Sequence, residues 1–315
     1  MTIQKYEDWM RPQIVALFNM EYGTAQGEFD QLFVNFYEHP FQREQGIRIV
    51  AVDGERIAGF QSFFYWPLSS GGRTLKSFQS GNSLVHPDYR GKGLFGKMLN
   101  YIHEEGSGFS FDVLIGFPVE ASYNSFIRNK WLNPFNLQWH VRLMNPVLSL
   151  FSNPEQQMEK HWPKRKSEAM QIESTIVCVQ QSHAYDDYRF VYQKRGYYRF
   201  HYSDEGHAAL FEVKVQRRKK IIKELIIGKF LTTTSDAAFI ENAFGSLVKE
   251  VKRKASFTLL SVAINPLSET LNDALAGNGF KKIDRHIYFI AKGPLADEVK
   301  DWSNWWMYRA DIDTW

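Results

Sequence analysis

The chain has 315 residues, about twice the length of a typical domain, so two domains of roughly 150 residues each are expected. Apolar residues make up 44% and aromatic residues 16%, which excludes a disordered chain. The formal net charge of +3 excludes a global field that would require nucleic acid or an anionic membrane as partner. The single cysteine, Cys178, excludes an intramolecular disulfide and a multi-cysteine metal site, and we expect it to pack in a strand.

The first predicted elements are helices, which we expect to fill residues 1–40 because apolar side chains recur there on one side. Two strands follow, GIRIVAVDG and RIAGFQSFFYWPL, and Asp53-Gly54 between them is a strong hairpin signal. Gly71-Gly72 then turns the chain into a third strand over residues 74–85. This part of the sequence therefore predicts an antiparallel meander.

A glycine-rich loop, YRGKGLFGK at residues 89–97, comes directly after the meander. Apolar residues from Leu94 onward then recur with a helical period, and a strand, FDVLIGF, and a helix, EASYNSFIRNKW, follow. A strand–loop–helix–strand–helix order after a meander predicts a mixed α/β fold with one parallel crossover.

The second half of the chain repeats this outline more faintly. We expect a hairpin around Arg217–Lys220, a helix over residues 236–254 and a strand over residues 256–264. Two similar outlines indicate a tandem duplication. The predicted domains are residues 1–146 and 167–315, joined by a polar, proline-containing linker at residues 147–166.

Three phosphate-binding patterns fit the glycine-rich loop. A P-loop requires Ser or Thr after its lysine, and Met98 follows Lys97 here. A dinucleotide fingerprint requires the first glycine almost directly after a strand, whereas five residues separate Val85 from Gly91. Glu120, at the end of the next strand, stands where a ribose-binding acid would, so this second pattern remains an open alternative.

The third pattern is V-x-P-x-x-R-G-x-G, which Val85, Pro87, Arg90, Gly91 and Gly93 match. In this motif and in the order of its elements, the first half of the chain resembles the GNAT acyltransferase superfamily. The resemblance implies an acyl-CoA N-acyltransferase fold, with a mostly antiparallel sheet and one splayed parallel strand pair. It also implies that the second half is a degenerate GNAT-like domain with an acceptor-binding or structural role and no coenzyme A site.

The resemblance places acyl-CoA between the two splayed strands, with the diphosphate on the backbone N–H groups of the loop. The residues it assigns to the donor are Leu84, Val85, Arg90, Gly91, Lys92, Gly93, Leu94, Phe95, Gly96, Ser122 and Phe126. Two positions depart from the family: Phe95 stands where a small residue is usual, and Phe126 stands where a tyrosine often protonates the departing thiolate.

Acyl transfer to an amine requires a base for the amine and tolerates the loss of an acid, because a thiol leaves readily. We name Glu120 as the first candidate base, His86 as the second and Tyr123 as a substitute acid. The alternatives are structural: Glu120 as an acid at a helix start, and His86 as a solvated turn residue.

The sequence therefore predicts a cytoplasmic N-acetyltransferase that transfers an acyl group from acetyl-CoA to a small-molecule amine through a tetrahedral intermediate, without a metal. The C-terminal run DWSNWWMYRADIDTW, with its aromatic and acidic side chains, suggests an amino sugar as acceptor or, equally, hydrophobic closure of the fold. Neither a membrane nor nucleic acid is expected as partner, although the basic run Arg217–Lys220 leaves RNA binding as an open alternative.

Two alternative functions remain. One is a non-catalytic acyl-CoA-binding regulatory module, and the other is an aminoacyl or peptidyl transferase.

Overall fold

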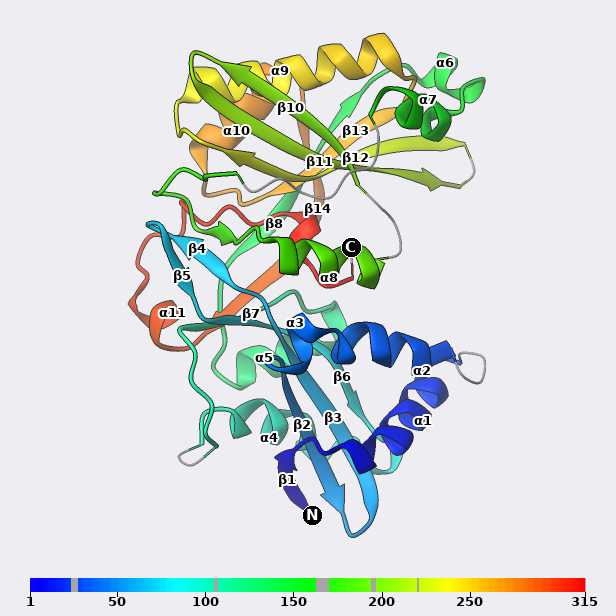
Figure 1. The fold of residues 1–315 in the computed structure, drawn as a ribbon, viewed down its shortest axis with the longest axis vertical. Helices are drawn as coiled ribbons and strands as arrows, with labels where there is room; N and C mark the ends of the chain where they lie inside the picture. Colours follow the sequence, from blue (N-terminus) through cyan, green and yellow to red (C-terminus); the bar gives the residue numbers. More distant parts are fainter. Residues whose placement is uncertain (24–27, 105–106, 163–169, 194–196, 220, 315) are drawn as a thin grey trace. The chain divides into compact units, whose positions relative to one another are not determined.

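The computed structural model describes residues 1–23, 28–104, 107–162, 170–193, 197–219 and 221–314. The chain forms two compact units (Figure 1), each assembled from several segments. The first unit comprises Met1–Leu68, Leu75–Pro134 and Tyr288–Val299, and the second comprises Ser69–Thr74, Phe135–Ile287 and Lys300–Trp315. The expected division into residues 1–146 and 167–315 stays a prediction, and residues 163–166 of the expected linker lie outside the described residues.

The first unit contains a sheet with the strand order β1-β2-β3-β6-β7-β14. Its strands are β1 (Thr2–Lys5), β2 (Ile47–Asp53), β3 (Arg56–Tyr65), β6 (Ser77–Val85), β7 (Val113–Gly116) and the end of β14 (Lys281–Lys292). Its helices are η1 (Asp8–Met10), α1 (Arg11–Tyr22), α2 (Glu28–Phe33), the π-helix η2 (Val34–Glu38), α3 (Pro40–Arg43), η3 (Pro87–Tyr89), α4 (Leu94–Tyr101), α5 (Glu120–Arg128) and α11 (Pro294–Glu298).

Helices cover both faces of this sheet (Figure 1). Phe60 of β3 packs edge-on against Phe18 of α1, whereas Phe63 lies in the same core as Met98 of α4. Residues three apart in a strand point to opposite faces, so α1 and α4 lie on opposite sides of the sheet. The Asp53-Gly54 hairpin is confirmed, with Gly54 at φ +62°.

The expectation that helices fill residues 1–40 is wrong for Thr2–Lys5. These four residues form β1, which pairs antiparallel with β2. A strand of four residues with partly exposed side chains is too short for its alternation to stand out in the sequence. Its assignment depends on β2, which lies more than 40 residues further along the chain.

The parallel pair β6 and β7 sets up an open edge. Their pairing runs from Ser77↔Val113 to Ser80↔Gly116, where β7 ends, while β6 continues to Val85. On its other side β6 stays paired with β3 as far as Val85. The backbone of residues 81–85 therefore extends past the end of β7.

The second unit contains the strand order β14-β8-β13-β12-β11-β10 and a small sheet, β5-β4-β9. Its strands are β4 (Leu68–Ser70), β5 (Arg73–Leu75), β8 (Leu132–Leu143), β9 (Cys178–Val179), β10 (Tyr198–Asp204), β11 (His207–Arg218), β12 (Ile222–Thr232), β13 (Leu259–Ile264) and the start of β14. Its helices are α6 (Pro146–Leu150), α7 (Pro154–His161), α8 (His183–Gln193), α9 (Ala237–Lys254), α10 (Glu269–Gly277) and η4 (Arg309–Asp311).

The second unit repeats the topology of the first. Strands β10, β11 and β12 form an antiparallel meander, α9 follows, and β13 returns parallel to β12 before α10. Each unit then receives one strand from the other half of the chain: β8 pairs with β13, and the end of β14 pairs with β7. The mixed fold, the mostly antiparallel sheet and the duplicated outline that the sequence predicts are thus confirmed.

The C-terminal segment is part of the core of the second unit. Trp302, Trp305, Trp306 and Tyr308 are all buried. The side-chain amide of Asn265 donates hydrogen bonds of 2.9 Å to the backbone carbonyls of Trp302 and Trp305. These aromatic side chains therefore close the fold, and the suggestion that they hold a sugar is wrong. Within the described residues, no helix combines the length and apolarity needed to cross a membrane.

Candidate functional site

The glycine-rich loop enters α4 through backbone conformations that favour glycine. Gly91 has φ +75° and Gly93, the N-cap residue of α4, has φ +71°, values that residues with a Cβ rarely adopt. A Cβ built on either glycine would meet no atom within 4 Å, and no side chain caps the helix start. The N–H groups of the first helical turn are therefore unpaired within the helix and open to an anion.

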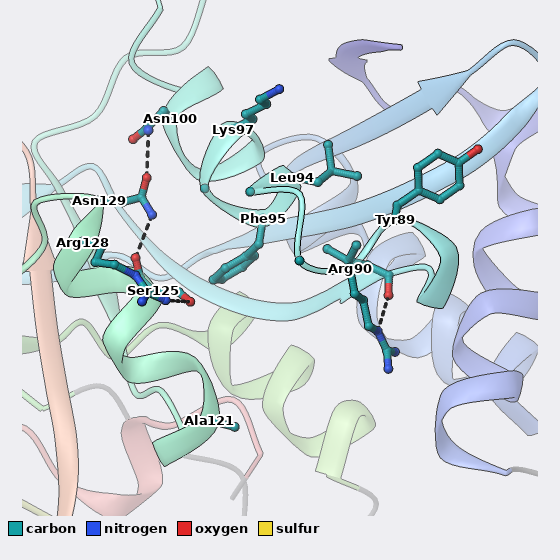
Figure 2. A pocket seen from close by; sticks show the side chains of 14 residues that line it. Tyr89, Arg90, Leu94, Phe95, Lys97, Asn100, Ala121, Ser125, Arg128 and Asn129 are labelled. Atoms are coloured by element: carbon teal, nitrogen blue, oxygen red, sulfur yellow. Dashed lines mark hydrogen bonds between the residues drawn. The ribbon is translucent and has the colours of Figure 1, made fainter.

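A cleft of about 780 Å³ lies between this helix start and α5 (Figure 2). Its lining residues are Val85, Tyr89, Arg90, Gly91, Gly93, Leu94, Phe95, Gly96, Lys97, Asn100, Ala121, Ser125, Arg128 and Asn129. Asn129 joins the two walls: its amide donates to the Ser125 carbonyl of α5, and its oxygen accepts from Asn100 of α4. A Cβ on Gly96 would lie 2.9 Å from the Asn129 side chain, so this glycine allows the close approach of the walls.

Two cations of the loop, Arg90 and Lys92, already have partners. Arg90 forms an ion pair with Glu21 of α1, and its Nε donates to the Val85 carbonyl at 3.0 Å. The Lys92 ammonium donates to the Asp88 carbonyl at 2.9 Å and does not line the cleft. Lys97 and Arg128 are two further cations in the lining, and neither was among the predicted site residues.

The open edge of β6 presents one backbone group to this region. The N–H of His86 donates to the Ala58 carbonyl of β3. Backbone groups alternate in direction along a strand, so the N–H of Val85 points away from β3, toward the edge left open by β7. Leu84 is buried and contributes packing at the same edge.

Glu120 and Tyr123 of α5 are linked through Tyr288 of β14. The Tyr288 hydroxyl donates to a Glu120 carboxylate oxygen at 2.6 Å, and the Tyr288 and Tyr123 rings stack with centroids 4.1 Å apart. The hydrogen bond to Glu120 raises the pKa of Tyr288 above its ordinary value. The Tyr123 hydroxyl donates to Asn133, so it is engaged as well. Because Ala121, next to Glu120, lines the cleft, this group lies at the start of the α5 wall.

Three other expected site residues have local structural contacts. His86 caps η3 by accepting from the Asp88 N–H, and its second ring nitrogen lies 3.0 Å from Arg56. The Ser122 hydroxyl donates to the Val119 carbonyl. Phe126 is 4% exposed and packs edge-on against Phe95 and Trp131.

A buried polar network that the sequence did not reveal lies where β6 bulges against β3. The pairing shifts between Phe60 and Ser62, and Asn82 opposite the shift has φ +47°, a strained value for a non-glycine residue. The Asn82 amide donates to the hydroxyl of Tyr37, which contacts the Ser62 hydroxyl.

The corresponding place in the second unit is closed. There α9 begins after Asp236, whose carboxylate accepts from the Phe239 N–H at 2.7 Å and so caps the helix start. Pairing of β12 with β13 ends at Ile227↔Val262. Beyond that point the C-terminal segment contacts Phe230 of β12 and Asn265, the residue that follows β13. The second unit therefore lacks the uncapped helix start found in the first.

Comparison with known proteins agrees with this geometry. Residues 2–126 match the family model described as an acetyltransferase (GNAT) domain. No curated protein matches the chain in sequence.

Solved structures with a similar fold include three bacterial proteins. A GCN5-related N-acetyltransferase from Anabaena variabilis is 10% identical, with 92% of this chain and 72% of that chain covered and a TM-score of 0.60. A GCN5-related N-acetyltransferase from Kribbella flavida is 10% identical, with 94% and 72% covered and a TM-score of 0.58. Eis1 from Mycobacterium abscessus is 9% identical, with 95% and 75% covered and a TM-score of 0.55. Residues 2–126, which carry the glycine-rich loop and the start of α5, are a GNAT acetyltransferase domain.

Proposed function

We propose that the first unit transfers an acetyl group from acetyl-CoA to the primary amine of a small molecule. The observation that carries this proposal is the uncapped start of α4 at Gly93, beside the open edge of β6. An anion-binding helix start next to an unpaired strand edge suits a donor with a diphosphate at one end and amide groups along its arm.

The donor residues divide into two groups. The backbone N–H groups from Gly91 to Phe95 would hold the diphosphate, with Lys97 and Arg128 adding positive charge at the cleft wall. The edge of β6 at Val85 would pair with the pantetheine arm, and the buried Leu84 would pack beside it. The N–H of Val85 is the proposed donor to the oxyanion of the tetrahedral intermediate.

We assign the proton transfers to Glu120 and Tyr288. Glu120 takes a proton from the attacking amine, and Tyr288 gives its hydroxyl proton to the sulfur as the C–S bond breaks. The proton on Glu120 then passes back to the Tyr288 oxygen along the 2.6 Å hydrogen bond between them. A tyrosine hydroxyl ordinarily has a pKa of about 10, so it is protonated at neutral pH, as an acid must be. The hydrogen bond to Glu120 raises the pKa of Tyr288 further.

The test is steady-state kinetics on Tyr288→Phe and Glu120→Gln, with acetyl-CoA and a panel of amino sugars, amino acids and polyamines. Loss of a positioned acid or base should lower kcat about 10²- to 10⁴-fold with little change in the KM for acetyl-CoA. Glu104→Gln, an exposed carboxylate of the same unit, is the matched control and should keep wild-type kcat. Full activity in both test variants would remove Glu120 and Tyr288 from the mechanism.

One observation favours a second candidate, a non-catalytic acyl-CoA-binding module. Phe126, at the family's tyrosine position, is fixed in the core between Phe95 and Trp131 and can supply no proton. Coenzyme A binding without thiol release for any amine in the panel would support this module. Acyl transfer from charged tRNA without coenzyme A would instead support an aminoacyl transferase.

A further inference from the structure

A second cavity, of about 640 Å³, lies within the second unit. Its lining residues are Trp139, Glu155, Lys214, Val215, Gln216, Arg217, Arg218, Ile226, Arg285, Arg309 and Thr314. Leu225 and Ile227 of β12 pack in the core with α9, so Ile226 between them points to the opposite face of the sheet. The cavity therefore lies on the face that α9 leaves uncovered.

The lining carries five cationic side chains and one carboxylate, that of Glu155. Two of the cations are held by acids: Arg217 pairs with Glu155, and Arg218 pairs with Glu224. Glu224 is only 2% exposed and also accepts a hydrogen bond from the Ser261 hydroxyl, so it fixes Arg218 firmly in place. Carboxylates thus neutralise two of the five cations, and the uncompensated positive charge comes from the others.

The remaining two arginines are crowded by other cations. The Arg285 guanidinium lies 4.8 Å from the Trp139 ring centroid, and burial together with the charge of Arg218 lowers its pKa. Burial lowers the pKa of Arg309 to about 10, against the attraction of Asp313, and the charges of Arg189 and Arg285 add to the decrease. The Nη1 of Arg309 is buried and has no hydrogen-bond partner among the described residues. A bound anion would therefore offset the repulsion among these guanidinium groups.

We propose that this cavity binds a small organic anion carrying two or more phosphate or carboxylate groups. Its volume is within the range of small-molecule sites, and guanidinium groups bind such oxyanions through paired hydrogen bonds. A stacking platform for nucleic acid is not favoured, because the face of Trp139 is already covered by Arg285.

The basic run at Arg217–Lys220 is only partly explained by this site. Arg217 and Arg218 line the cavity, and Lys219 lies in the hairpin turn at φ +48°. Lys220 lies outside the described residues. Lys223, further along, is buried and donates to backbone carbonyls at the end of α6, including that of Leu150 at 3.3 Å.

The experiment is calorimetric titration with inorganic pyrophosphate and, separately, with citrate, which distinguishes phosphate from carboxylate ligands. The protein carries Gly93→Val, so that the glycine-rich loop of the first unit does not contribute to pyrophosphate binding. We expect one site per chain for at least one probe. Adding Arg285→Gln or Arg309→Gln should weaken binding at least tenfold, because each removes a charge-assisted contact. Arg253→Gln, which removes an exposed arginine paired with Glu250 on α9, should leave the affinity unchanged.

If the glutamine variants unfold, Arg285→Lys tests the proposal instead. It keeps the positive charge but removes the planar guanidinium, which can donate two parallel hydrogen bonds. It should lose affinity to an intermediate degree. Absence of binding for both probes, or equal binding in the Arg285 variants and the Arg253 control, would overturn the proposal. Tighter binding of an oligoribonucleotide than of either probe, lost in the same variants, would replace the small anion with RNA.

Discussion

At the residue scale, Gly93 meets two requirements: it supplies a positive φ, and it leaves the backbone open to a ligand. A pair of matched substitutions can separate them. We expect Gly93→Val to abolish coenzyme A binding, because a branched side chain at the helix start would stand between the diphosphate and the N–H groups. Isothermal titration with coenzyme A measures this loss.

The matched control is Gly54→Val in the β2–β3 turn. Gly54 has φ +62° and equally open surroundings, so the substitution carries a similar backbone strain of about 1–2 kcal/mol at a place outside the cleft. Gly54→Val should bind coenzyme A with wild-type affinity despite a lower melting temperature. Equal loss in both variants would attribute the effect to stability, and wild-type binding by Gly93→Val would exclude the loop as the diphosphate site.

The sequence groups candidate site residues that lie close together in the chain, and it does not reveal those that lie far apart. Val85, Arg90, Gly91 and Gly93 fall in one short motif, and all four line the cleft. Tyr288 bonds to Glu120 from 168 residues further along the chain, and no spacing rule connects residues so far apart. Cys178 needed only a local pattern: it is buried, and burial raises the pKa of its thiol to about 12, as expected of a packing residue.

At the element scale, one buried ion pair attaches the C-terminal segment to β12. The Lys229 ammonium lies 2.6 Å from an Asp311 carboxylate oxygen, and their side chains are 3% and 0% exposed. Burial opposes the charge on Lys229, but Asp311 and Glu212 outweigh it and raise the lysine pKa. Asp311 also accepts from the Tyr308 N–H, so the pair fixes the turn of η4.

We expect Lys229→Met to lower the free energy of unfolding by about 3–5 kcal/mol, because it leaves the Asp311 charge buried without its partner. Urea denaturation followed by tryptophan fluorescence measures the change. Lys249→Met, on the exposed side of α9, is the control and should shift the midpoint little. If Lys229→Met unfolds at the wild-type midpoint, the segment is held by its aromatic packing alone.

Predicting elements from sequence succeeds where a strong local pattern exists. The Asp53-Gly54 hairpin and the long amphipathic helix α9 are confirmed. β1 and β10 were not predicted, because both are edge strands with several exposed residues. Their strand identity comes from hydrogen bonding to β2 and β11, which is a property of the fold and not of the segment.

At the scale of the whole molecule, the two units share a topology but differ at the helix start where coenzyme A would bind. α4 begins at an uncapped glycine, whereas α9 begins at Asp236, whose carboxylate would repel a phosphate. We therefore expect one coenzyme A site per chain, measured as the stoichiometry of a calorimetric titration. Asp236→Gly should leave that stoichiometry at one, because the C-terminal segment still fills the place between β12 and β13. Two equivalent sites would contradict this view of the second unit.

The first unit cannot complete its sheet during synthesis until β14, near the end of the chain, has been made. The apolar strand β7 needs β14 on its free edge, and Ile290, the partner of Gly116, leaves the ribosome about 170 residues later. At typical translation rates of roughly 5–20 residues per second, that edge stays unpaired for on the order of ten to thirty-five seconds. An unpaired apolar strand edge is a template for aggregation. Slower translation or higher temperature should therefore reduce the yield of folded chain, and chaperones that bind exposed strands should restore it.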